Sequence, residues 1–214
     1  ILRGQVISLG FDPYGRGGAG VTFLQRPSLP RDEVILPDGV LDRVRSHVLG
    51  IAGHRSRLQA AGQHLKRGVL LYGPPGTGKT HTVRHLLSES PGTTAVLLTG
   101  AALGAIAQAA SLARAMAPSL VVLEDIDLVA EDRSMGHGPQ PLLFSVLDAL
   151  DGLDADADIA FIMTTNRVDV LERALAQRPG RVDLAVEIPL PDSADRVKLM
   201  QLYSPQGVFS AEAL

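Results

Sequence analysis

Apolar residues fall along most of the chain in short runs, separated by segments in which apolar residues recur at helical spacing. Five of these runs are apolar on both faces and predict buried strands, at residues 68–72, 95–99, 120–123, 159–163 and 184–188. The segments between and after them predict helices at residues 81–87, 101–117, 141–150, 170–176 and 192–203. Strands that alternate with helices predict an α/β fold, with a five-stranded parallel sheet flanked by helices on both faces.

The first 36 residues have a different pattern. Residues 6–11 and 21–24 are β-prone runs, and the glycine-rich stretch between them predicts a hairpin loop. These glycines do not open a helix within a βαβ unit, so they fail the context test for a dinucleotide fingerprint. Residues 34–36 are a candidate third strand. We therefore expect a small β-rich appendage over residues 1–36, ahead of the main domain.

The strand predicted at 68–72 leads into a phosphate-binding loop of the pattern G-x-x-x-x-G-K-[ST]. The loop consists of Gly73, Pro74, Pro75, Gly76, Thr77, Gly78, Lys79 and Thr80. A strand before it and a helix after it are the context that this motif requires, which argues against a glycine-rich turn with an exposed lysine. Lys79 is then placed to reach the β- and γ-phosphates of a nucleotide, and the hydroxyl of Thr80 to hold Mg²⁺. We include the next residue, His81, among the nucleotide-binding residues.

Carboxylates follow the apolar run 120–123, at the strand end where ligands bind in open α/β sheets. Glu124 and Asp125 there form a Walker B element in which the usual order, Asp then Glu, is inverted. Glu124 is the candidate Mg²⁺ residue, acting through water, and Asp125 the candidate that polarises the attacking water. Asn166, which follows the strand at 159–163, could orient the same water. The alternatives are an acidic loop for the first pair and a strand-end turn for Asn166.

Arg178 and Arg181 project from a tight turn that Pro179 and Gly180 fix. Guanidinium groups held in this way suit phosphoryl oxygens, so both arginines are candidate catalytic residues. The alternative is a solvated basic turn.

In order and spacing, these motifs resemble those of the AAA ATPases over residues 35–191. The resemblance implies a P-loop NTPase that binds and hydrolyses ATP to ADP with Mg²⁺, at sites between neighbouring subunits of a hexamer-like ring that remodels or translocates a macromolecule. It also implies that Asn166 is sensor 1 and that Arg178 and Arg181 are arginine fingers for the next subunit. Residues 37–191 would be the AAA large subdomain, and residues 192–214 the start of a truncated helical lid.

In motif detail the chain is similar to the branch of AAA proteins that contains the mitochondrial translocase of the Rieske protein, which also has Glu before Asp in Walker B. Unfolding members of the family carry an aromatic pore loop, whereas residues 99–105 here are few and lack an aromatic residue. That departure, and the shorter side chain of Asp125, favour an alternative function. In that alternative the chain is a nucleotide-dependent assembly scaffold or switch that binds ATP with little turnover.

Composition narrows the possible partners and location. The net charge of −3 gives no strong nucleic-acid signal, so basic residues between 43 and 67 are expected at a subunit interface or on a solvated face. His81 and His85 have the spacing of a helical metal pair but no evident third ligand, so we expect solvated or capping roles for them. The chain contains no cysteine and no apolar run of membrane-spanning length. We expect a fragment of a longer cytoplasmic protein whose macromolecular partner is unknown.

Overall fold

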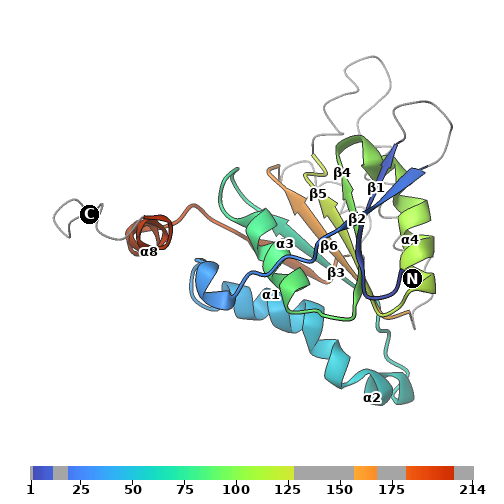
Figure 1. Ribbon diagram of the computed structural model, residues 1–214. Coiled ribbons are helices and arrows are strands. Elements are labelled where there is room, and N and C mark those ends of the chain that lie inside the picture. Colours follow the sequence, from blue (N-terminus) through green and yellow to red (C-terminus); the bar gives the residue numbers. More distant parts are fainter. Residues whose placement is uncertain (1, 12–18, 128–156, 168–181, 205–214) are drawn as a thin grey trace.

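The computed structural model describes residues 2–11, 19–127, 157–167 and 182–204 (Figure 1). The helices predicted at 141–150 and 170–176, and both Arg178 and Arg181, lie outside these residues. The described residues form one sheet with helices on both of its faces.

The sheet has seven strands in the order β2-β1-β4-β5-β6-β3-β7. The five predicted strands are all present and mutually parallel, as β3 (Arg67–Tyr72), β4 (Thr94–Thr99), β5 (Ser119–Glu124), β6 (Ile159–Thr165) and β7 (Leu184–Glu187). Because they are parallel, their carboxyl ends meet along one edge of the sheet. The phosphate loop and Asn166 follow strands at this edge, and Glu124 is the last residue of β5 there.

The prediction of five strands was wrong, because the N-terminal segment adds two more to the same sheet. β1 (Val6–Phe11) pairs in parallel with β4, and β2 (Ala19–Leu24) pairs antiparallel with β1. The physical reason is burial: Ile7 and Leu9 are 0% and 4% exposed and continue the apolar layer of β4. The third strand expected at 34–36 is also absent, since a 3₁₀ turn at Arg31–Glu33 precedes an irregular segment there.

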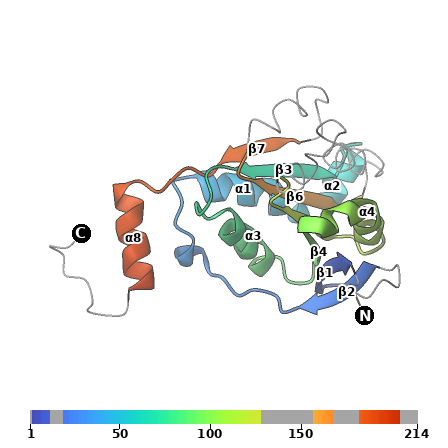
Figure 2. The same cartoon turned by 90° about the horizontal axis from the view of Figure 1, so that it is seen from above.

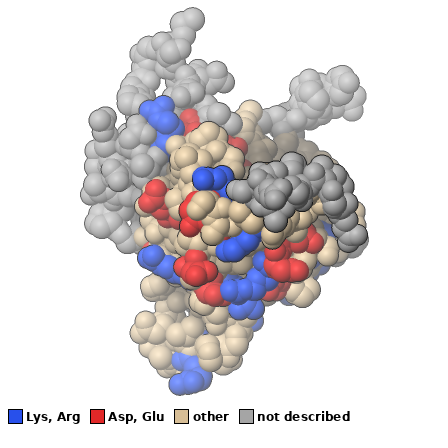
Figure 3. Space-filling model, turned by 90° about the vertical axis from the view of Figure 1, so that its left-hand side faces the viewer, with Lys and Arg blue, Asp and Glu red and all other residues tan. Residues whose placement is uncertain are grey.

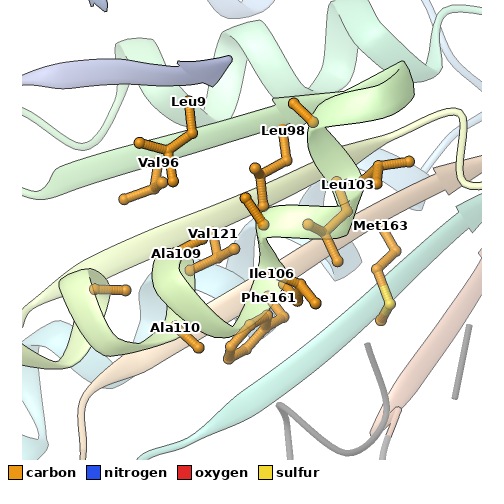
Figure 4. Close-up of a cluster of buried hydrophobic side chains, with 14 of the residues drawn as sticks. Leu9, Val96, Leu98, Leu103, Ile106, Ala109, Ala110, Val121, Phe161 and Met163 are labelled. Atoms are coloured by element: carbon orange, nitrogen blue, oxygen red, sulfur yellow. The ribbon is translucent and has the colours of Figure 1, made fainter. Parts of the chain in front are cut away.

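The helices divide between the two faces of the sheet (Figure 2). One face packs against α4 (Ile106–Ala115) and the 3₁₀ turn Gly100–Ala105 that precedes it; Figure 4 shows Phe161 and Val121 of the sheet beside Ile106, Ala109 and Ala110 of this helix. The other face packs against α1 (Val40–Leu49) and α3 (Lys79–Ser88). A short helix, α2 (Arg55–Ala60), leads from α1 toward β3. The two apolar layers hold the strands that carry the loop and the acidic residues.

The last described helix, α8 (Ser193–Tyr203), stands apart from the sheet at the end of an extended segment (Figures 1 and 2). It begins where predicted, with the Asp192 side chain accepting a 2.8 Å hydrogen bond from the backbone N–H of Asp195. Within the described part of the chain, no helix is both long enough and apolar enough to span a bilayer.

Candidate nucleotide-binding site

The phosphate loop connects the carboxyl end of β3 to the first turn of α3, as its motif predicts. Gly73 has φ of +147°, and a Cβ atom on it would lie 2.1 Å from the carbonyl oxygen of Ile188. That contact exists because Ile188, just beyond β7, donates its N–H to Tyr72 O at 2.7 Å. Only glycine therefore allows β7 to support the start of the loop.

The end of the loop places backbone donors and a lysine at the start of α3. Gly78 caps the helix in the left-handed region, with φ of +100°. The first N–H groups of a helix have no partner within it and favour an anion there. Lys79 is only 6% exposed, and its Nζ donates to Gly73 O at 2.7 Å and to Pro74 O at 2.8 Å. Burial lowers the pKa of Lys79, although Asp125 and Asp127 oppose this effect.

Thr80 and Glu124 meet at the metal position that the sequence predicts. Glu124 is the last residue of β5, and a hydrogen bond links its carboxylate to Thr80. Burial raises the pKa of Glu124, and the charge of Asp125 raises it further, while Thr80 and Arg84 act in the opposite direction. A hydroxyl and a carboxylate that converge beside a phosphate loop are oxygen ligands that fit Mg²⁺, held directly or through water.

Asp125 and Asn166 also lie together, although they are 41 residues apart in the sequence. Asn166 Nδ2 is 3.5 Å from Asp125 Oδ1, at the upper limit of a hydrogen bond. The backbone of Asp125 has φ of +50°, a left-handed conformation that is uncommon for residues other than glycine. Its N–H donates to Thr164 Oγ1 at 2.9 Å, which helps to hold that conformation. The structure therefore brings together the two residues expected to position the attacking water.

Sequence reasoning assigned no role to Asp127. Asp127 is 9% exposed, and its Oδ1 accepts hydrogen bonds from Thr165 Oγ1 at 2.8 Å and from the backbone N–H of Asn166 at 3.1 Å. The sequence signal was present: a third acidic residue so close to a buried strand needs donors from a neighbouring element. Those donors belong to the end of β6, which sequence spacing alone does not identify.

A cavity of about 250 Å³ lies beside the phosphate loop. Its walls come from the irregular segment at residues 33–37, from the loop at residues 76–78 with His81, and from the region of α8. The α8 side contributes Pro189, Pro191, Asp195, Leu199 and Tyr203. A mostly apolar cavity next to a phosphate site suits the flat base of a nucleotide.

The two histidines of α3 were expected to have solvated or capping roles, and neither imidazole is fully solvated. His81 lines the cavity, and its Nε2 is buried with no hydrogen-bond partner among the described residues. His85 is 1% exposed, and its Nδ1 lies 2.9 Å from Leu29 O. Within the described ranges no group of three or more His, Cys, Asp and Glu side chains could hold a metal ion.

Asp183, two residues after Arg181, is tied to the start of β3. Its N–H donates to Gly68 O at 3.0 Å, and its Oδ2 accepts from Gly68 N at 2.7 Å. These two hydrogen bonds anchor the residue just before β7 to the backbone at the start of β3.

The described surface carries charges of both signs. On the face seen in Figure 3, Lys and Arg side chains are interspersed with Asp and Glu side chains.

Comparison with known proteins identifies matches over the region that contains this site. The family described as "ATPase family associated with various cellular activities (AAA)" matches residues 69–190, more than half of the chain. The ATP-dependent zinc metalloprotease FtsH of Acidimicrobium ferrooxidans is 30% identical over 91% of this chain and 31% of its own length. The 26S protease regulatory subunit 6A of Caenorhabditis elegans is 32% identical over 71% of this chain and 38% of its own. The proteasome-activating nucleotidase of Methanoculleus marisnigri is 35% identical over 64% of this chain and 36% of its own length. The chain thus spans less than half the length of each of these relatives.

Proposed function

Because this chain belongs to the AAA family of ATPases, we propose that it binds ATP with Mg²⁺ and hydrolyses it to ADP and phosphate. The observation that carries the proposal is the meeting of three elements at the carboxyl edge of the sheet. These are the buried Lys79 of the phosphate loop, the Thr80–Glu124 pair, and the Asp125–Asn166 pair. Each element supplies one requirement of phosphoryl transfer: a cation for the phosphates, oxygen ligands for the metal, and polar groups for the water.

Nucleotide binding begins with the loop and Lys79. Gly73 O and Pro74 O now accept hydrogen bonds from Lys79 Nζ, so the ammonium group is held over the loop before any anion arrives. Phosphate oxygens replace these neutral acceptors with charged ones, which stabilises the buried cation more strongly. Gly76, Thr77 and Gly78 line the cavity and contribute loop backbone next to the phosphates, while Pro75 belongs to the same turn. A Mg²⁺ ion held by Thr80 and Glu124 would neutralise charge on the phosphates.

Hydrolysis depends on Asp125 and Asn166. Asp125 accepts the proton of the attacking water, and the amide of Asn166 holds that water in line with the terminal phosphate. Asp125 is one methylene shorter than the glutamate of the usual Walker B order. Its left-handed backbone compensates in part, because it re-aims the carboxylate from the end of β5 toward Asn166.

The assembly is a further part of the proposal. We place the site in a hexamer-like ring in which Arg178 and Arg181 reach the ATP of the neighbouring subunit, and in which turnover remodels or translocates a macromolecular partner. The names of the relatives, an ATP-dependent protease and regulatory subunits of proteasomes, support a protein as that partner. The inverted order of Glu124 and Asp125 supports placing the chain in the Rieske-translocase branch. The domain boundaries after residues 36 and 191 and a cytoplasmic location also remain proposals.

A second candidate function has one observation in its favour. Residues 99–105 run from the last residue of β4 into the 3₁₀ turn Gly100–Ala105 and carry no aromatic side chain for gripping a threaded polypeptide. A scaffold that binds ATP and scarcely hydrolyses it would not need such a grip. Phosphate release measured over a range of protein concentrations separates the two functions: a ring enzyme turns over faster per subunit as it assembles, whereas the scaffold stays near zero throughout.

The direct test of the proposed chemistry is Asp125→Asn in the full-length protein. The amide keeps the shape of the side chain but cannot take the proton, so phosphate release should fall about 10²- to 10⁴-fold. ATP affinity, measured with a fluorescent analogue, should stay within a few fold. Glu124→Gln is the companion variant and should raise the Mg²⁺ concentration needed for half-maximal rate. Full turnover in Asp125→Asn would refute the assigned role and make Glu124 the candidate base.

A further inference from the structure

The loop after β5 and the end of β6 are joined by hydrogen bonds beyond the point where the strands stop pairing. Strand pairing ends at Leu123↔Met163. After it, Asp125 N donates to Thr164 Oγ1 at 2.9 Å, and Ile126 N donates to Thr164 O at 3.1 Å. The two segments that carry Asp125 and Asn166 therefore do not diverge as independent loops.

Asp127 completes this connection from the other direction. Its Oδ1 accepts from both Thr165 Oγ1 and Asn166 N, so one buried oxygen holds two consecutive residues of the β6 end. Thr165 is fully buried, and its hydroxyl oxygen also accepts from Arg167 N at 3.0 Å. The peptide on each side of Asn166 is consequently fixed, and the Asn166 side chain is left facing Asp125.

We propose that Asp127 is a positioning residue for hydrolysis, which holds Asn166 against Asp125 without touching nucleotide or water itself. The inference rests on the proposed function of the same site. Asp125 sits in a strained backbone conformation that persists only when its surroundings determine it, and the hydrogen bonds to the end of β6 are those surroundings. Loss of the Asp127 acceptor frees the Asn166 peptide, and a displacement of about 1 Å at a catalytic group costs about 100-fold in rate.

A second possible role for Asp127 is purely electrostatic. Its charge acts on Lys79 in the same direction as that of Asp125, favouring the protonated ammonium group. Substitution by asparagine separates the two roles, because the amide oxygen still accepts both hydrogen bonds while the charge is gone.

The test compares Asp127→Ala with Asp127→Asn in the full-length protein, with kcat, KM and ATP affinity measured separately. Asp127→Ala should lower kcat about 100-fold and leave ATP affinity within about threefold, since the phosphate loop is untouched. Asp127→Asn should restore kcat to within roughly fivefold of the original, since both donors keep their acceptor. An unchanged kcat in Asp127→Ala, or an equal loss in both variants, would overturn the positioning role.

A double-variant experiment tests whether Asp127 acts through Asn166. Residues that act as a unit show non-additive losses, so Asp127→Ala should lower kcat little further once Asn166→Ala is present. Two independent losses that multiply would contradict the inference. Asp158→Ala is the matched control: this buried carboxylate immediately precedes β6 at its opposite end, and its loss should leave kcat unchanged at temperatures where the protein is folded.

Thr165→Val keeps the inference testable even if Asp127→Ala does not fold. It removes one of the two donors with little change of shape, and kcat should fall by roughly tenfold, in line with the loss of about one hydrogen bond to a charged group. No change in kcat there would overturn the inference. Failure of the proposed function itself has a different signature, because Asp125→Asn would then leave phosphate release unchanged.

Discussion

Charged side chains are buried at both ends of the parallel strands, at the amino edge of the sheet, where the strands begin, and at the carboxyl edge, where they end. The two edges differ in the partners that these charges have. At the amino edge, Asp158 is 6% exposed and fully partnered. Its Oδ1 accepts from Arg67 Nη1 at 2.7 Å, and its Oδ2 from Arg55 Nε at 2.7 Å. Arg67 also donates to Val48 O and Leu65 O, each at 2.8 Å, which ties α1 and the segment before β3 into the same cluster.

At the carboxyl edge, the charges have weaker partners. Among the described residues, Lys79 Nζ donates hydrogen bonds to two backbone carbonyl oxygens, and Asp125 Oδ1 lies 3.5 Å from the side-chain amide of Asn166. Burial raises the pKa of Glu124 and lowers that of Lys79, so for each residue it disfavours the charged form. Charges that find full partners stabilise a fold, whereas charges held apart from good partners are typical of sites where a ligand supplies the missing interaction. We therefore expect the charges at the amino edge to stabilise the fold and those at the carboxyl edge to bind the nucleotide.

The largest effect is expected from the arginines that would complete the carboxyl edge from a neighbouring subunit. Arg178→Ala combined with Arg181→Ala should lower phosphate release roughly 10³- to 10⁵-fold, the value of an arginine finger in related phosphate-loop enzymes. Subunits with this pair of changes and subunits with Lys79→Ala should each be inactive alone. Mixed in one assembly, some interfaces join an intact loop to intact arginines, and part of the activity should return. A mixture that forms mixed rings and stays inactive would show that the arginines do not act in trans.

The next effect concerns the amino edge and should appear in stability alone. Asp158→Ala leaves the buried Arg67 guanidinium without its carboxylate, and breaking such a pair typically costs about 3–5 kcal/mol of unfolding free energy. Denaturant unfolding measures the loss. Nucleotide affinity of the folded variant should be unchanged, so a large drop in affinity with little change in stability would reverse the assignment of the two edges.

The smallest effect is a pH dependence at the amino edge. Burial lowers the pKa of His47 from 6.5, and Arg67 acts in the same direction, while Asp183 and a hydrogen bond with the Gly68 backbone oppose it. A lowered pKa in the folded state means that the unfolded chain binds the proton more readily. The contribution of His47 to the free energy of unfolding is therefore fully present above about pH 6.5 and is lost as the pH falls from there through the folded-state pKa.

His47→Gln tests that pH dependence. The variant should lose less stability than the original protein between pH 7.5 and pH 5, measured as the shift of the denaturant midpoint. Because other groups titrate in the same range, the informative quantity is the difference between the two proteins. Equal slopes would show that His47 does not contribute.

The central strands and the phosphate loop could be predicted from sequence because their signals are local. Runs such as residues 120–123 are apolar on both faces, and the loop glycines precede a lysine at fixed spacing. The partner of β1 could not be predicted in the same way, since Val6 pairs with Ala95 far along the chain and strand pairing is set by non-local burial. The appendage expected over residues 1–36 is for this reason partly an extension of the main sheet.

The same limit applies to the polar contacts. Arg67, expected at an interface or on a solvated face, is instead 8% exposed and paired with Asp158. This pairing could not be predicted from local sequence, because the two residues are 91 positions apart. Asp127 follows two other acidic residues in the sequence, but its donors, Thr165 and Asn166, lie at the end of β6 and just after it. Residue types and spacing predicted a chemistry for the site, whereas the contacts that hold its residues in place became visible only with the fold.

The most direct measurement of the difference between the two edges is ATP affinity after removing one cation from each. In titrations with a fluorescent ATP analogue and Mg²⁺, Lys79→Ala should weaken binding by roughly 30-fold to several thousand-fold, as expected when a buried charge pair loses one partner. Arg55→Ala, which removes a cation from the Asp158 cluster, should bind as the original protein does. Unchanged affinity in Lys79→Ala, or equal losses in both variants, would contradict the assignment of nucleotide binding to the carboxyl edge.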